Sequence, residues 1–62
     1  MTLESVLQVL EDDQLINLII DGVIIGGLYK MSFVGDDDFI QAEGQRTVRL
    51  IKANKNALII GI

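Results

Sequence analysis

The sequence of 62 residues contains neither cysteine nor histidine. Disulfides are therefore excluded, and so is any metal site built on thiolate or imidazole ligands. A chain this short buries only about 60% of its unfolded surface, so such domains usually depend on disulfides, metals or oligomerisation. Oligomerisation is the remaining route. We expect one domain, residues 1–62, that assembles with copies of itself.

Long hydrophobic runs are also missing. The longest, Val23–Leu28 and Ala57–Ile62, fall well short of the roughly 18 apolar residues that cross a bilayer. The first residues include Glu4 and no basic cluster, unlike a signal peptide. We therefore expect no membrane contact and a cytoplasmic location. Because 50% of the residues are nevertheless apolar, we expect the surplus to meet protein, and most simply a copy of the same chain.

Basic residues are scarce. Five bases face nine acids, which gives a formal net charge of −4. This charge argues against nonspecific binding to a nucleic-acid duplex, which normally leaves a basic footprint. No base precedes Lys30, and four of the five lie between Arg46 and Lys55, so a local basic patch late in the chain is still compatible with the sequence.

Catalytic groups are equally few. The hydroxyl residues have no base placed beside them by any motif, and the carboxylate pairs fall in turns. We therefore expect no enzyme, no cofactor, no resident metal and no small-molecule substrate. The acids at 36–38 have the oxygen ligands that a hard cation prefers, but they lack EF-hand spacing, so a solvated acidic turn is favoured.

The first segment predicts a helix. Thr2 is a suitable N-cap, and Glu4 in the first turn suits the positive end of the helix dipole. The apolar residues recur with the spacing of one helical face, at Leu3, Val6, Leu7 and Leu10. We expect this helix to end near Glu11.

Strands are predicted next. The segment 14–20 is rich in Ile and Leu and leads into Asp21-Gly22, a strong signal for a two-residue hairpin turn. The return strand is expected over Val23–Phe33, and the glycines Gly26 and Gly27 inside it predict a sharp bend.

The rest of the chain suggests shorter elements. Residues 35–38 are expected to turn, and Phe39–Glu43 fits either a short strand or one turn of helix. Strands are predicted over Thr47–Ala53 and Ala57–Ile62, joined by a turn at 54–56. The first and last strands are apolar on both faces, which predicts closure into a barrel or burial against another subunit.

The stretch from Ile16 to Leu28, with Asp21-Gly22 between alternating apolar residues and glycine in the second strand, resembles the first half of the Sm1 motif of the Sm-like family (Sm, Lsm and Hfq proteins). Lys55-Asn56-Ala57-Leu58 resembles part of the Sm2 motif of the Hfq type. The resemblance implies a mostly-β fold, in which an N-terminal helix precedes a strongly bent five-stranded antiparallel sheet that forms a small Sm-like or SH3-like barrel.

The resemblance also implies an assembly and a ligand. Sm-like subunits form rings of roughly five to eight copies by pairing edge strands, and they bind single-stranded RNA near the pore. On this reading the RNA-binding residues are Phe33, Asp38, Phe39, Lys55 and Asn56. The subunit interface is expected to contain Val48, Leu50, Leu58, Ile60 and Ile62.

Two other functions stay open. The acidic net charge, and the lack of the asparagine that the family places in the loop after the second strand, favour a structural or protein-binding ring without RNA affinity. The other is a small α+β dimer unrelated to Sm proteins, an inhibitor that captures a basic partner. This last function requires Phe39–Glu43 to be helical and the assembly to be twofold.

Overall fold

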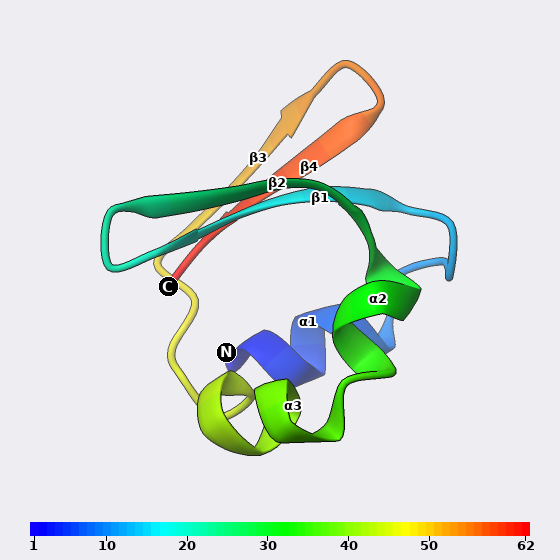
Figure 1. The fold of residues 1–62 in the computed structure, drawn as a ribbon. Coiled ribbons are helices and arrows are strands. Elements are labelled where there is room, and N and C mark those ends of the chain that lie inside the picture. The colour runs from blue at the N-terminus through cyan, green and yellow to red at the C-terminus, as the bar shows by residue number, and fades with distance from the viewer.

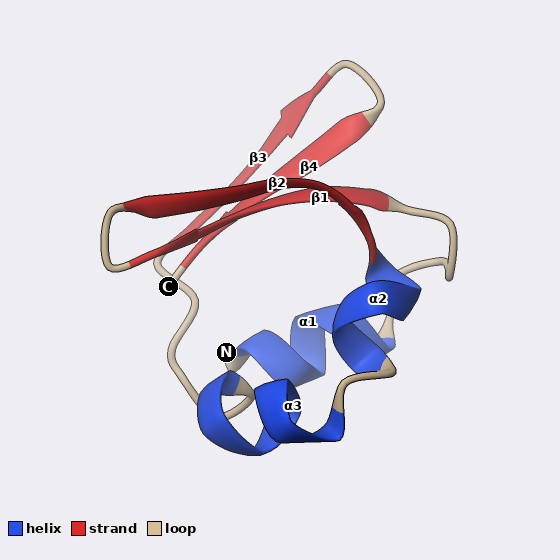
Figure 2. Ribbon diagram, in the orientation of Figure 1, coloured by secondary structure: helices blue, strands red, loops and turns tan.

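The computed structural model describes residues 1–62 as a small α+β domain, in which an open four-stranded sheet carries three short helices on one face (Figures 1 and 2). The strands lie in the order β2-β1-β4-β3. The central pair, β1 and β4, is parallel, whereas the two outer pairs are antiparallel. The elements in chain order are α1 (Leu3–Gln8), β1 (Leu15–Ile20), β2 (Val23–Tyr29), α2 (Lys30–Val34), α3 (Asp37–Glu43), β3 (Leu50–Asn54) and β4 (Ala57–Gly61).

This architecture differs from the predicted one in strand number and direction. The sheet has four strands, not five, and it is mixed rather than antiparallel. Phe39–Glu43, left open as strand or helix, belongs to α3, and the predicted strand over Val23–Phe33 ends at Tyr29. The physical reason is the parallel pairing of β1 with β4, because parallel neighbours need a long crossover connection. Helices α2 and α3 lie on that connection.

Helix α1 confirms the predicted cap. The Thr2 side chain accepts a hydrogen bond from the Ser5 N–H at 3.2 Å, and the Ser5 hydroxyl accepts one from the Thr2 N–H at 3.1 Å. This reciprocal capping box satisfies two amides that the first turn would otherwise leave free. The helix ends at Gln8, one turn earlier than expected.

The β1–β2 hairpin also confirms its predicted turn. Asp21 and Gly22 both adopt positive φ, 50° and 83°, as a two-residue hairpin turn of this type requires. Further along, a bulge sets Asn17 opposite Gly26 and Gly27, and Gly27 has φ 73°. The Asn17 side-chain oxygen accepts a hydrogen bond from the Gly27 N–H at 3.0 Å. The predicted bend in this strand is therefore a side-chain-stabilised β-bulge.

The core lies between the sheet and the helices. Ile16 and Leu18 of β1 and Ile60 of β4 are almost fully buried, at 1%, 1% and 0% exposure. They meet α1 and Phe33 of α2, and the complete core is Leu3, Val6, Leu7, Ile16, Leu18, Phe33, Ile60 and Ile62. The opposite face of the sheet has no helix over it (Figure 1). The strands that are apolar on both faces are the two central ones, and only one face of each is covered.

No helix of this chain combines the length and the apolar character needed to span a membrane.

Candidate functional site

The residues predicted to bind RNA do not come together in one place. Phe33 is only 4% exposed, and its ring packs against Phe39 with centroids 5.4 Å apart. Lys55 and Asn56 form the β3–β4 turn, at the opposite end of the molecule from α3, which carries Asp38 (Figure 1). The structure thus joins the two aromatic rings to each other in the helical layer and leaves the basic turn apart from them.

The residues predicted to form a subunit interface divide between the two faces of the sheet. Ile60 and Ile62 are core residues at 0% and 8% exposure, and Leu58 packs against them. Because these side chains are covered within one chain, they have little exposed surface that a neighbouring subunit could bury. Val48 also packs against the core, whereas Leu50 points to the other face and is 44% exposed.

The acids at 36–38 act locally. Asp36 caps α3, because its side chain accepts a hydrogen bond from the Phe39 N–H at 3.1 Å. Asp37 and Asp38 occupy the first turn, where carboxylates suit the positive end of the helix. No group of three or more metal-ligating side chains is assembled here or elsewhere in the chain.

Arg46 takes part in two of the three ion pairs. Its guanidinium binds the Asp21 carboxylate at 2.5 and 3.1 Å and Glu43 at 3.0 Å. The hydrogen bond from Arg46 lowers the pKa of Asp21, and the same pair raises the pKa of Arg46. These contacts tie the β1–β2 turn to the end of α3, which is a structural role.

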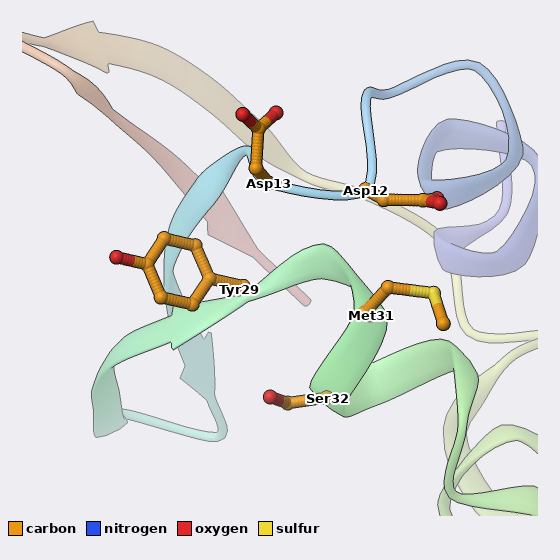
Figure 3. Close-up of a pocket in the computed structure, with 5 residues that line it drawn as sticks. All are labelled: Asp12, Asp13, Tyr29, Met31 and Ser32. Atoms are coloured by element: carbon orange, nitrogen blue, oxygen red, sulfur yellow. The ribbon is translucent and has the colours of Figure 1, made fainter.

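A hollow of about 520 Å³ opens between the α1–β1 loop and the junction of β2 with α2 (Figure 3). Backbone hydrogen bonds fix this junction: the Lys30 N–H donates to the Gln14 carbonyl at 2.9 Å, and the Met31 N–H donates to the Asp12 carbonyl at 3.3 Å. The residues that line the hollow are Asp12, Asp13, Tyr29, Met31 and Ser32.

The two carboxylates of the hollow differ. Asp12 accepts an ion-pair hydrogen bond from Lys30 at 3.0 Å, whereas the Asp13 side chain has neither an ion pair nor a hydrogen bond. Figure 3 shows Asp13 and Tyr29 on one side of the hollow and Asp12 beside Met31 on the other. Tyr29 is 53% exposed. A free carboxylate, an accessible aromatic ring and a thioether thus line the same hollow.

Such a set of groups suits one kind of ligand. A lysine or arginine side chain combines an apolar stem with a cationic head. The ring and the thioether can hold the stem, the ring face attracts the cation, and the carboxylate accepts its hydrogen bonds. A second hollow of about 410 Å³ is almost entirely apolar and offers no such combination. It is lined by Met1, Ser5, Val6, Val9, Leu10, Ile51 and Leu58.

No sequence motif indicated Asp12 or Asp13 as binding residues. The sequence did contain one indication that Tyr29 lies near these acids. A two-residue turn at Asp21-Gly22 sets the register of the hairpin. With the bulge, that register places Tyr29 opposite Leu15, and so close to the acids that precede β1. No protein-family model, curated protein or solved structure matches this chain. The resemblance to the Sm-like family therefore stays a prediction.

Proposed function

We propose that this chain is a small protein-binding domain that captures a lysine or arginine side chain of a basic partner in the hollow beside Asp13 and Tyr29. The observation that carries the proposal is that the unpaired Asp13 carboxylate and the exposed Tyr29 ring line the same hollow. The net charge of −4 adds long-range attraction for a basic partner. The helical conformation of residues 37–43 meets one requirement of the inhibitor predicted from the sequence.

The chain provides its own reporter for a test. Tyr29 is the only tyrosine and there is no tryptophan, so tyrosine fluorescence reports directly on the hollow. A short peptide with neutral ends and one arginine is titrated into the protein, and the same peptide with citrulline serves as the uncharged comparison. We expect the arginine peptide to change the fluorescence saturably, and the citrulline peptide to bind far more weakly.

A pair of variants makes the test specific. Asp13→Asn is expected to weaken arginine-peptide binding about fivefold, since an exposed ion pair contributes up to about 1 kcal/mol. Asp37→Asn changes the net charge equally, but on the first turn of α3, and it should leave the affinity nearly unchanged. Equal effects of the two variants would mean that net charge alone attracts the peptide, and the assigned hollow would then be wrong.

The RNA-binding ring implied by the Sm-like resemblance, together with its closed five-stranded barrel, is a separate prediction with its own test. Native mass spectrometry should find a ring of roughly five to eight chains if that prediction holds. Such a ring should bind a uridine- or adenine-rich oligonucleotide at low salt, and Lys55→Ala should weaken that binding. Monomers or dimers, or no oligonucleotide binding, would count against it.

A further inference from the structure

Strand β3 lies at one edge of the sheet, with β4 on one side of it and no strand on the other. All five of its residues are exposed. None of the backbone hydrogen bonds outside the helices and strands involves Leu50–Asn54. The pairing of β3 with β4 has no register shift, whereas a bulge distorts β2 at the opposite edge. The regular backbone edge of β3 is therefore open to a further strand.

The β3–β4 turn decides which backbone groups face this free edge. The turn at 55–56 has two residues, so the flanking residues Asn54 and Ala57 form a hydrogen-bonded pair. Along antiparallel strands, such pairs alternate with pairs that make no hydrogen bonds to each other. Ile51 and Ala53 belong to the second kind. Their N–H and C=O groups therefore point to the free edge.

Apolar and basic side chains flank the edge on different faces of the sheet. On the helix side, Ile51 is 45% exposed and lines the apolar hollow of about 410 Å³ together with Val9. Lys52 follows Ile51 in the strand and so points to the other face. Arg49 and Lys55 lie just beyond the two ends of β3. None of these three bases takes part in an ion pair.

We infer that the β3 edge binds an extended segment of an acidic partner protein, which adds to the sheet as a further strand. Alternate side chains of a strand point to opposite faces. Apolar side chains of the segment therefore enter the hollow beside Ile51, and acidic side chains lie opposite Lys52 on the other face. Strand addition of this kind draws affinity from main-chain hydrogen bonds and specificity from the alternate side chains. The inference does not rest on the proposed capture of a basic side chain.

Charge selects an acidic partner over a second copy of this chain. When two β3 edges pair antiparallel about Lys52, each Lys52 lies opposite the other, and Arg49 lies opposite Lys55. Like charges directly opposite each other destabilise a strand pair, and lysine on an edge strand hinders self-association. An acidic segment places opposite charges at these positions instead.

The complex is expected to be weak. A single added strand buries much less than the roughly 800 Å² on each partner of a stable complex. The net charge of −4 also repels an acidic segment at long range. We therefore expect a dissociation constant of roughly 10–100 µM.

A set of short peptides with capped ends tests the inference. In the parent peptide glutamate and valine alternate, and calorimetric titration at low salt should show saturable binding. Successive N–H groups of a strand point to its two edges in turn. Methylation of one set of nitrogens, on the valines or on the glutamates, should therefore abolish binding, while methylation of the other set should leave it nearly unchanged. For an antiparallel strand the sensitive set is the valines, because these lie opposite Ile51 and Ala53.

Hydrogen exchange and two variants locate the added strand. With saturating parent peptide, the amides of Ile51 and Ala53 should exchange at least about tenfold more slowly, while the amides of β2 keep their rates. Lys52→Gln should weaken binding about two- to fivefold, the effect of one exposed ion pair. Gln41→Glu lowers the net charge by the same amount on α3, and it should leave the affinity nearly unchanged.

Several outcomes would overturn the inference. These are no binding of the parent peptide at millimolar concentration, equal binding of the two methylated peptides, and equal affinity for a peptide with glutamine in place of glutamate. Equal weakening by Lys52→Gln and Gln41→Glu would mean that net charge alone governs binding. Displacement of the parent peptide by oligouridylate at equal concentration would mean that the bases form a phosphate site.

Discussion

The Arg46 guanidinium holds the Asp21 carboxylate through two hydrogen bonds, at 2.5 and 3.1 Å, across 25 positions of the chain. Arg46 follows α3, whereas Asp21 occupies the turn between β1 and β2. The contact therefore ties the helical crossover to the far end of the hairpin, and it makes the free energy of unfolding depend on acid pH.

The direction of that dependence follows from the pKa of Asp21. The hydrogen bond from Arg46 lowers this pKa in the folded chain below its ordinary value of 3.8. The stabilisation is therefore fully present above that ordinary value and is lost as the pH falls through the lower folded value. Chemical denaturation at a series of acid pH values should show stability falling over this window, and Asp21→Asn should remove that part of the fall.

Asp13→Asn is the matched control for this prediction. It removes the same charge from a side chain that makes no ion pair. An equal flattening of the acid profile by both variants would show that general charge repulsion, and not the contact between Asp21 and Arg46, sets the pH dependence.

The β-bulge predicts non-additive stabilities. A Cβ added at Gly26 would lie 2.9 Å from the Asn17 side-chain oxygen, which must then move and release the Gly27 N–H. Gly26→Ala and Asn17→Ala should each cost about 1 kcal/mol, the usual contribution of one hydrogen bond, and the two costs should overlap in the double variant. Gly27→Ala is the control, because φ 73° strains any other residue by about 1–2 kcal/mol whatever stands at position 17. Additive costs of the Gly26 and Asn17 changes, measured by urea denaturation, would contradict the coupling.

Two adjacent residues of β4 should respond differently to the loss of one methyl group. Ile60 is 0% exposed in the core, whereas Ile59 lies on the face of the sheet that points away from the helices and is half-buried. Ile60→Val should lower the free energy of unfolding by about 1 kcal/mol, and Ile59→Val by less than half of that. Both are measured by urea denaturation. Equal losses of unfolding free energy would mean that both faces of the sheet are buried to the same extent, which would contradict a core on one face only.

Lys30→Met should strengthen capture of a basic side chain. The Lys30 side chain is only 12% exposed, so methionine retains its apolar packing while the carboxylate of Asp12 is released into the hollow. We expect arginine-peptide affinity to rise about two- to fivefold, since an exposed ion pair is worth about 0.2–1 kcal/mol. The peptide titration monitored by Tyr29 fluorescence measures this change. Unchanged or weaker binding would show that Asp12 has no part in recognition.

Local residue chemistry was enough to predict the local features. Thr2 begins α1, Asp21 and Gly22 make the hairpin turn, and the glycines at 26 and 27 bend β2. Each of these features depends on neighbours within a few positions, because capping, positive φ and side-chain alternation are properties of short segments. The sequence alone also determined the absence of disulfides, the net charge and the two segments that are apolar on both faces as strands.

Only the tertiary structure decided the rest. Strand direction depends on which edge of β1 receives β4, and the parallel register of Leu15 with Ala57 is a contact between segments more than 40 positions apart. That pairing requires the helical crossover, so that Ile60 faces the core and Ile59 faces away from it. In the resulting fold Asp13 and Tyr29 line the same hollow. Such long-range contacts form because they bury apolar residues from the whole chain, and a local sequence pattern does not specify which distant segments will pair.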